Sequence, residues 1–369
     1  MTVANNTVWE YTRAGRLSST IAQAARAIPE PGPSELVIQV RAAALNPVDE
    51  QLAQSPPSLL SFLGCAIPSP SKPLVPTSDF AGVVVASKSA AYVVGDEVYG
   101  QRFSADGNGF LATYVKVEAS APFVKKPKGL GWTDAAAVPL VYTTVYDALV
   151  EWGRLSMEGE EGLSVLVLGG SSGTGHVAVQ MAKKMGCNVV ASCSGKNAEM
   201  VKSLGADEII DYTTQNVPQA ALMSRYAPYA VVLDCVGGTD LLPDLDNLLL
   251  DSPQRPELGI YVTIVGDKTS RDAMGGAATN LYTPAQAVRT VLGRLNDHLP
   301  RWTRGWTGRR YACIKLNPSK DKLESYEKFM EEGGKVIVDS VWPFGKAREA
   351  YERLESARAK GKVVVEVSK

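Results

Sequence analysis

The sequence has neither an excess of charge of one sign nor a long apolar run. Its 369 residues contain 38 Lys and Arg against 39 Asp and Glu, a formal net charge of -1. Without a basic excess, no global field attracts the chain to nucleic acid or to anionic lipid. The longest apolar runs, such as 81–86 and 230–233, are far shorter than the roughly 20 residues that cross a bilayer. We therefore expect neither a nucleic-acid partner nor a membrane span.

Cysteine is also scarce. The five cysteines are odd in number and never spaced as C-x-x-C, which argues against a disulfide framework and against a structural zinc cluster; they are Cys65, Cys187, Cys193, Cys235 and Cys313. The N-terminus has no basic stretch followed by an apolar one, and it carries Glu10, an acid that mitochondrial presequences avoid. We expect a reducing, cytoplasmic location, with an organelle as the alternative.

Two patterns divide the chain. In its first third, short apolar segments broken by Pro and Gly predict an antiparallel, barrel-like β region with strands at 35–42, 81–86, 96–99 and 112–117. The breaker-rich stretch 55–76 is long enough for a functional loop. From Thr133, which we expect to cap a helix, apolar residues recur at helical spacing; they are Val141, Val145, Leu149 and Trp152. A second domain therefore begins near this point.

Beyond this helix, apolar strands alternate with helices. Strands are predicted at 164–168, 188–193, 208–212, 230–236 and 260–265, with helices at 175–185, 198–204, 218–226 and 241–250 between them. Strands that are apolar throughout and joined by crossover helices predict a parallel, doubly wound sheet. We interpret 267–310 as an irregular insertion before a sixth strand at 311–316. The tail, with helices near 321–332 and 346–357 and a strand at 362–367, is expected to return to the first domain.

A glycine-rich turn joins the first of these strands to its helix. It reads Gly169-Gly170-Ser171-Ser172-Gly173-Thr174-Gly175. Glycines let a backbone turn tightly and approach a pyrophosphate, while a helix N-terminus offers free N–H donors and a partial positive charge. Together with the βαβ pattern, this turn predicts a dinucleotide site in which the residues from Gly170 to Gly175 contact the cofactor.

The end of the second strand indicates which dinucleotide is bound. NAD sites place an acid about 20 residues past the glycine turn, where it holds the ribose 2′-hydroxyl, but the sequence here is Cys193-Ser194-Gly195-Lys196-Asn197. Ser194 and Lys196, together with Tyr212 after the third strand, are instead candidates for binding a 2′-phosphate. We therefore predict NADPH rather than NADH. The alternative is that Lys196 is an ordinary surface lysine.

The same turn permits a different interpretation, because Gly169 to Gly173 matches G-x-S-x-G, the nucleophile turn of serine hydrolases. Ser171 would then be the nucleophile and His298 the base, with Asp234 or Asp267 as the acid. The further glycine at Gly175 and the β region that precedes the sheet favour the dinucleotide.

Further short segments follow one another along the chain: 44–49 (ALNPVD), 78–84 (SDFAGVV), 95–100 (GDEVYG), 135–139 (AAAVP), 203–207 (SLGAD), 210–212 (IDY) and 361–365 (GKVVV). With the glycine turn, and in this order, they resemble the medium-chain dehydrogenase/reductases, in the zinc-free quinone oxidoreductase branch. The resemblance covers nearly the whole chain. Within the branch, the chain is similar to the chloroplast-envelope quinone oxidoreductase homologues and the reticulon-interacting mitochondrial oxidoreductase, and more distantly to fungal trans-acting enoyl reductases.

The resemblance implies an α/β chain in which a GroES-like, β-barrel-type catalytic domain (1–133 and 321–369) is split around a doubly wound Rossmann domain (134–320). It implies NADPH in the cleft, hydride transfer to an activated C=C bond (enone, enal or enoyl) or to a quinone, and a homodimer. Zinc-dependent relatives need a Cys and a His in the catalytic domain. This chain has the 46–49 segment and Ser78-Asp79 in those places, so we expect no metal site.

The remaining candidate site residues lie at positions that match functional positions of the family. Asn46 and Asp49 would orient the nicotinamide or the substrate, although an Asn-Pro turn followed by Asp also commonly caps a helix. Tyr142 stands where relatives have a small residue, so it would narrow the pocket or donate to a carbonyl. The nicotinamide side is assigned to Thr144, Val236 and Gly266, with simple packing as the alternative for Thr144.

Two alternatives to a reductase of free small molecules stay open at this stage. One is a trans-acting enoyl reductase in a biosynthetic pathway, and the other is an NADPH-binding sensor with little catalysis. The sequence fixes neither the substrate, a small molecule with a conjugated carbonyl or quinone group, nor the proton donor.

Overall fold

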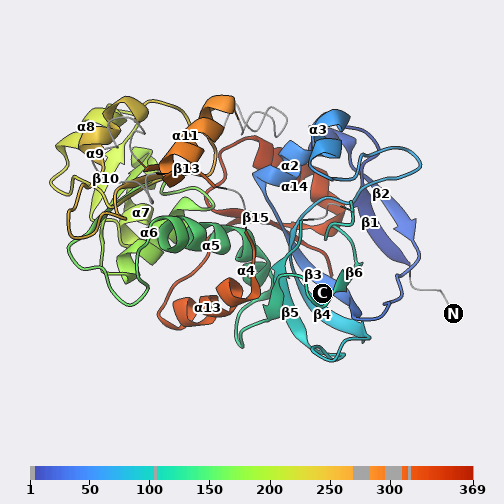
Figure 1. Cartoon of the computed structure of the whole chain (residues 1–369). Helices are drawn as coiled ribbons and strands as arrows, with labels where there is room; N and C mark the ends of the chain where they lie inside the picture. Colours follow the sequence, from blue (N-terminus) through green and yellow to red (C-terminus); the bar gives the residue numbers. More distant parts are fainter. Residues whose placement is uncertain (1–4, 104–105, 269–282, 296–309, 315–316, 369) are drawn as a thin grey trace.

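The computed structural model describes residues 5–103, 106–268, 283–295, 310–314 and 317–368. Two large β-sheets organise the chain (Figure 1). One combines the N-terminal third, coloured blue to cyan, with the tail, coloured red; the other comes from the middle of the chain, coloured green to orange. In the part of the chain that the structure describes, no helix is long and apolar enough to cross a membrane.

Six parallel strands form the sheet of the middle segment. They are β8 (Ser164–Leu168), β9 (Asn188–Cys193), β10 (Glu208–Asp211), β11 (Val231–Asp234), β12 (Ile260–Thr263) and β13 (Arg310–Cys313). Their order is β10-β9-β8-β11-β12-β13, the Rossmann order in which two halves of the sheet extend from the first strand. Every residue of β8, β11 and β12 is buried, as expected of central strands covered on both faces. The predicted doubly wound sheet is confirmed.

Helices connect these strands where the sequence predicts them, with shifted ends. They are α6 (Gly175–Lys184), α7 (Ala198–Ser203) preceded by the 3-10 helix η2 (Gly195–Asn197), α8 (Val217–Met223), and α9 (Leu245–Leu248) preceded by η3 (Leu242–Asp244). The single helix predicted at 241–250 is therefore two short ones, with a proline at the start of the first. The chain is already extended again at Leu249.

The stretch predicted as an irregular insertion, 267–310, contains a regular helix. This helix, α11 (Pro284–Leu295), packs against β13. It is therefore the crossover that the parallel strands β12 and β13 require, and the prediction of an irregular insertion was wrong for this part. Gly-rich and Arg-rich residues on both sides of 284–295 obscured its helical period. Residues 269–282 and 296–309 lie outside the described residues.

Strands from both ends of the chain form the other large sheet. They are β3 (Glu35–Leu45), β4 (Asp79–Ser87), β5 (Glu97–Gln101), β6 (Tyr114–Glu118), β7 (Phe123–Lys125), β14 (Val338–Pro343) and β15 (Lys362–Glu366). The order is β14-β15-β3-β4-β5-β7, with β6 also paired to β3. All these pairs are antiparallel except β14 with β15. The tail thus joins the first sheet, while the domain bounds given above stay a prediction.

Smaller elements surround this sheet. A two-stranded ribbon of β1 (Asn6–Glu10) and β2 (Ala22–Arg26) encloses α1 (Leu17–Thr20). The sequence did not predict this ribbon, because β2 is AQAAR, without β-branched or aromatic residues. Helices α2 (Pro47–Ala53) and α3 (Pro57–Phe62) follow β3, and η6 (Phe344–Lys346) with α14 (Ala347–Glu355) lies between β14 and β15.

A helical run joins the two halves. It consists of α4 (Trp132–Ala137), α5 (Pro139–Tyr146) and the π-helix η1 (Asp147–Trp152). Thr133 does not cap this run as predicted, because Gly131 occupies the N-cap position and Thr133 lies in the first turn. Helix α13 (Lys320–Glu331) packs against both α5 and β7, so it also lies where the two halves meet.

Candidate functional site

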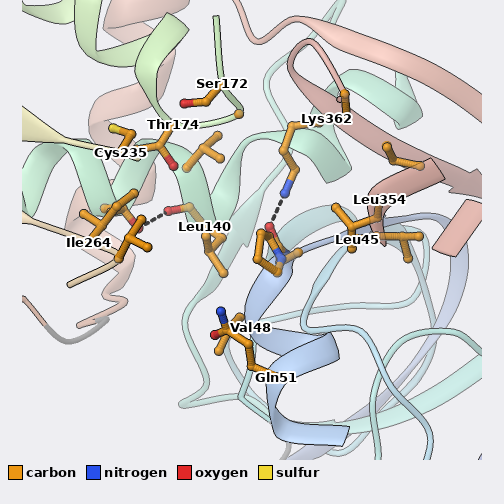
Figure 2. A pocket seen from close by; sticks show the side chains of 18 of the residues that line it. Leu45, Val48, Gln51, Leu140, Ser172, Thr174, Cys235, Ile264, Leu354 and Lys362 are labelled. Carbon is orange, nitrogen blue, oxygen red and sulfur yellow. Dashed lines mark hydrogen bonds between the residues drawn. The ribbon is translucent and has the colours of Figure 1, made fainter. Parts of the chain in front are cut away.

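A cavity of about 510 Å³ lies between the two halves (Figure 2). The six-stranded half contributes the glycine turn from Ser172 to Thr174, together with Cys235 and Ile264 after β11 and β12. The other half contributes residues around the end of β3, the start of α2 and the start of β15. Most lining side chains are apolar, among them Leu45, Val48, Leu140, Val141, Ile314 and Leu354. An enclosed apolar space with a few polar groups is the usual form of a small-molecule site.

The glycine turn is tightly folded at the carboxyl end of β8. Gly169 has φ +78°, in the left-handed region that favours glycine. A Cβ atom on Gly175 would lie 2.1 Å from the carbonyl oxygen of Gly169. Among the described residues, the amide N–H groups of Ser171, Gly173 and Thr174 have no hydrogen-bond partner. Free amides at the start of α6 fit a bound anion such as a pyrophosphate.

Residues after β9 and β10 form a second part of this edge. The Ser194 hydroxyl and the Asn197 side-chain oxygen are buried without a hydrogen-bond partner, an arrangement that proteins avoid unless a ligand or water satisfies it. Lys196 is exposed beside them. Tyr212, which is 58% exposed, follows the neighbouring strand. The three side chains predicted to bind a 2′-phosphate therefore gather at adjacent strand ends.

One acid at this edge was missed in the sequence. A Cβ atom on Gly195 would lie 2.5 Å from a carboxylate oxygen of Asp211. That carboxylate accepts hydrogen bonds from the amide and the hydroxyl of Thr213, at 3.0 and 2.6 Å, and these bonds lower the pKa of Asp211. The rule for NAD sites looks for an acid at the end of the second strand. Asp211 lies at the end of the third strand, β10, so that rule does not identify it.

A buried carboxylate holds the next two strand ends together. Asp234, at the end of β11, accepts hydrogen bonds from the amides of Val236 and Gly237 at 2.9 and 2.8 Å. It also accepts the Tyr261 hydroxyl at 2.9 Å and the Thr263 hydroxyl at 2.8 Å. The Thr263 oxygen in turn accepts the amide of Gly266 at 2.8 Å. Asp234 thereby fixes the turns that carry Val236 and Gly266, two residues predicted to contact the cofactor.

Helix α5 presents Thr144 to the cavity but not Tyr142. The Thr144 hydroxyl donates to the Leu140 carbonyl at 2.6 Å, and both residues line the cavity. Tyr142 is fully buried on another face, where its ring packs on Tyr326 with centroids 5.1 Å apart. The Tyr142 hydroxyl is paired with that of Ser325 at 2.9 Å. Because it packs against α13, Tyr142 neither narrows the cavity nor reaches a substrate there, and the prediction is corrected in this respect.

A polar network lies beside the cavity where β3 ends and β15 begins. The Asn46 side-chain amide donates to an Asp79 carboxylate oxygen at 2.9 Å. The Lys362 amine donates to the same oxygen at 3.2 Å and also to the Asn46 side-chain oxygen. Asp49 accepts the Asn46 backbone amide at 3.0 Å and the Ser78 hydroxyl at 3.1 Å, so the helix-capping alternative for Asn46 and Asp49 is present in the geometry. Asp79 and Lys362 were not predicted as site residues, although both lie in motif segments.

Burial raises the pKa of both acids in this network. It raises the pKa of Asp49 to about 7, with the neighbouring Asp79 charge adding to the effect. Burial also raises the pKa of Asp79 to about 6, against the lowering effect of Lys362. Raised pKa values on two neighbouring acids beside a cavity are typical of functional sites.

Stability is expected to fall with rising pH because of Asp49. Its folded pKa of about 7 exceeds the ordinary value, so between about pH 4 and pH 7 the folded chain holds a proton that the unfolded chain has released. The free energy of unfolding then decreases across this window, by about 4 kcal/mol for this group. Urea denaturation of wild type and Asp49→Asn, repeated across the window, should show a flatter dependence in the variant. Equal slopes would contradict the assignment, and the exposed Asp240→Asn is the control.

Within the residues that the structure describes, Ser171 has no histidine partner that could act as the base of a hydrolase. The Ser171 hydroxyl accepts the Asn197 side-chain amide at 3.1 Å. His176 uses both ring nitrogens elsewhere: Nε2 accepts the Ile337 amide at 2.8 Å, so Nδ1 donates to the Ser172 carbonyl at 2.9 Å. Burial lowers the pKa of His176 to about 4, which keeps it neutral. His298 lies outside the described residues, and Asp234 is occupied by the four donors above.

Only part of the predicted site lines the cavity. Five of the predicted residues line it: Asn46, Thr144, Ser172, Gly173 and Thr174. Others belong to the turns at the carboxyl edge of the six-stranded sheet without lining the cavity: Gly170, Ser171, Gly175, Ser194, Lys196, Tyr212, Val236 and Gly266. Asp49 supports Asn46 from behind. Lining residues that the sequence analysis did not nominate include Gln51, Phe103, Cys235 and Lys362.

Two protein-family models match the chain. Residues 32–128 match the alcohol dehydrogenase GroES-like domain, and residues 204–365 match the model described as zinc-binding dehydrogenase.

Relatives similar along most of their length include a trans-enoyl reductase of Aspergillus terreus, 33% identical, which covers 91% of this chain and 87% of its own. The chloroplast envelope quinone oxidoreductase homolog of Arabidopsis thaliana is 29% identical, with 92% of each chain covered. The mitochondrial NAD(P)H oxidoreductase RTN4IP1 of Bos taurus is 30% identical and covers 91% of this chain and 82% of its own. The fungal enzyme is thus at least as similar as the other two.

Solved structures share the fold. The quinone oxidoreductase of Coxiella burnetii has a TM-score of 0.76 at 23% identity, covering 99% of this chain and 100% of its own. A mycobacterial protein solved with NADPH has a TM-score of 0.72 at 21% identity, covering 98% and 100%. Both family models, in order, and relatives above 30% identity along nine-tenths of the sequence show that the chain belongs to the medium-chain dehydrogenase/reductase family of oxidoreductases.

Proposed function

We propose that this chain is an NADPH-dependent reductase that adds hydride to the activated C=C bond of an enone, enal or enoyl compound, or reduces a quinone, without zinc. The observation that carries the proposal is the shared cavity. One wall is the glycine turn, which has three unpartnered amides, and a second wall beside it carries Asn46 and Lys362, with the buried Asp79 hydrogen-bonded to both. A dinucleotide on the first wall and a carbonyl compound at the second would meet in one apolar space.

The dinucleotide would bind along the carboxyl edge of the six-stranded sheet. The free amides of the glycine turn would hold its pyrophosphate. The unpartnered Ser194 hydroxyl, the exposed Lys196 amine and Tyr212 would hold the adenosine 2′-phosphate, the group that distinguishes NADPH from NADH. A mycobacterial protein of the same fold was solved with NADPH, which supports this choice.

The reacting end of the site would lie farther along the same edge. NADPH, when bound, supplies the hydride. Thr144, Val236 and Gly266 are the residues proposed beside the nicotinamide, the last two on turns that Asp234 fixes. The apolar lining excludes water from the reacting atoms and strengthens any hydrogen bond made there.

The donor set of the cavity supports a zinc-free reaction. A catalytic zinc site needs three protein ligands of the Cys, His, Asp or Glu type. No group of three or more such side chains is arranged to hold a metal within residues 5–103, 106–268, 283–295, 310–314 and 317–368. Asp79 is occupied by Asn46 and Lys362 rather than by a second ligand-type residue.

Two related functions would use the same cofactor but differ from a reductase of free small molecules. The similarity to a fungal trans-enoyl reductase supports an enoyl substrate, as a trans-acting enoyl reductase would take. An NADPH-binding sensor would use the same cofactor wall with little turnover. The homodimer and the cytoplasmic location stay predictions; relatives carry mitochondrial and chloroplast names.

The function is tested by following oxidation of NADPH in the presence of enones, enals, an enoyl thioester and quinones. NADH and an added chelator serve as controls. Turnover that prefers NADPH and is unaffected by chelator supports the proposal. A preference for NADH, or inhibition by chelator, would contradict the cofactor or the zinc-free part. Tight NADPH binding without turnover would favour the sensor.

Cofactor selectivity is expected to depend on Lys196. In Lys196→Ala, KM for NADPH should rise about tenfold, because an exposed charge-assisted contact to phosphate is worth about 1.5 kcal/mol. KM for NADH should not change, since NADH lacks that phosphate. Lys202→Ala, another exposed lysine nearby on α7, is the matched control. An equal rise for both cofactors would assign Lys196 to another part of the dinucleotide.

A further inference from the structure

We propose that Lys362 is the catalytic proton donor of this site: its ammonium group receives the carbonyl oxygen of the substrate and protonates it during reduction. The inference rests on the proposed function and deepens it, because it names the end of the substrate that the site holds. That end is a carbonyl conjugated to the reacting double bond, or one carbonyl of a quinone.

Lys362 is a buried residue of the cavity lining. It begins β15, lines the cavity, and has a side chain only 3% exposed. Figure 2 shows its amine extending from the tail segment into the space between the Ser172 side and the Leu45 side. Its stem passes the glycine turn, since a Cβ atom on Gly173 would lie 3.6 Å from Lys362 Cδ. The amine therefore lies inside the cavity that the turn borders.

The Lys362 amine donates hydrogen bonds to two side chains beside the cavity. Within the described residues its amine has two acceptors, Asn46 Oδ1 and Asp79 Oδ2. An ammonium group has three donors, so one N–H is left for a ligand in the cavity. Among the lining residues that the structure describes, Lys362 is the only Lys or Arg. The other charged lining residue, Asp147, is paired with Lys322.

The chemistry of the reduction gives that donor a role. Hydride addition to the β-carbon moves the electron pair of the C=C bond toward the carbonyl oxygen, where negative charge develops. A fixed cation in a dry site stabilises such charge strongly. As the O–H bond forms, one Lys362 N–H bond breaks and leaves a neutral amine; the resulting enol becomes the ketone by transferring its proton to carbon. A quinone oxygen takes the proton in the same way.

Asp79 supplies the means of restoring the donor. Its carboxyl shares the Lys362 nitrogen through a 3.2 Å contact, and burial raises the pKa of Asp79 to about 6. After the transfer, the neutral amine regains a proton from water that enters the cavity as the product leaves, and the Asp79 carboxylate beside it stabilises the restored ammonium form. Asn46, bonded to both groups, fixes their geometry.

The test compares Lys362→Met with the double variant Lys362→Met/Asp79→Asn. The single variant leaves a buried carboxylate without its cation and can fail to fold. The double variant removes both charges, so it preserves the packing. We expect it to bind NADPH within about twofold of wild type, while kcat for an enone falls by about 100-fold to 1000-fold. Lys360→Met, exposed two residues earlier, should keep wild-type kcat.

Solvent isotope effects complete the test. Wild type should turn over more slowly in D₂O, and the double variant should lose the part of this effect that comes from Lys362 while its effect with deuterated NADPH rises. A folded double variant with wild-type kcat would overturn the inference. So would a loss of NADPH affinity with kcat preserved at saturation, since Lys362 would then bind a cofactor phosphate. A wild-type chain that turns over no substrate in the panel would overturn the proposed function and this inference together.

Discussion

Gly175→Ala is expected to weaken NADPH binding by at least 100-fold, about 2.7 kcal/mol. Alanine at the start of a helix normally favours helix formation by up to about 1 kcal/mol over glycine. Here its Cβ atom would lie 2.1 Å from the carbonyl oxygen and 2.8 Å from the carbonyl carbon of Gly169. Both are backbone atoms, so the turn itself must open. The amides of Gly173 and Thr174 then lose the alignment that a pyrophosphate requires.

A matched glycine shows that the effect is local. A Cβ atom on Gly345 meets nothing within 4 Å, so Gly345→Ala should bind NADPH as wild type does. Titration by nicotinamide fluorescence, with near-UV circular dichroism to confirm folding, measures both variants. Wild-type affinity in a folded Gly175→Ala chain would contradict the assignment of the glycine turn to the cofactor.

The strand, turn and helix of the proposed cofactor side could be predicted from the sequence because their signal is local. A strand, a turn rich in glycine and a helix follow one another within the stretch from Ser164 to Lys184, and hydrogen bonding within that stretch determines the geometry. The alternating pattern that follows then determines the sheet. The Rossmann order was therefore predictable, and the errors there concern helix ends and the composition around α11.

The catalytic side could not be predicted in the same way. Lys362 lies 283 residues from Asp79 and 316 from Asn46 in the sequence, and the pairing of both β15 and β4 with β3 brings them together. Tyr142 illustrates the converse error. Its place on α5 was correct, but the tail helix α13 decides which face of α5 is covered. In both cases a contact with the tail, invisible to local pattern, settles the role.

Asp234→Ala is expected to give the largest loss of stability. The carboxylate is fully buried, and it accepts four hydrogen bonds, two from the amides of Val236 and Gly237 and two from the hydroxyls of Tyr261 and Thr263. Burial raises the pKa of Asp234 and the four donors oppose that rise. Without the carboxylate, buried donors are left unsatisfied, at a cost of about 3–5 kcal/mol. Thermal unfolding should show a Tm lower by about 5 °C, because the entropy of unfolding scales with chain length.

Two variants distinguish the network from a general effect of mutation. Asp234→Asn keeps one acceptor oxygen, so its Tm should lie between those of wild type and Asp234→Ala. The exposed Asp240→Ala, on the same connection, should leave Tm unchanged. A Tm within about 2 °C of wild type for Asp234→Ala would contradict the proposed cost of the unsatisfied donors.

Asp234 also connects stability to the site, because its hydrogen bonds fix the turns after β11 and β12. If it served stability alone, NADPH affinity in Asp234→Ala would equal that of wild type at temperatures well below the transition. We expect at least a tenfold loss there, since the turns that carry Val236 and Gly266 lose their common anchor. The stabilisation of the folded chain by NADPH grows with the logarithm of its affinity, so a given concentration should raise Tm less in Asp234→Ala than in Asp240→Ala. Equal ligand-induced shifts would assign Asp234 to the core rather than to the site.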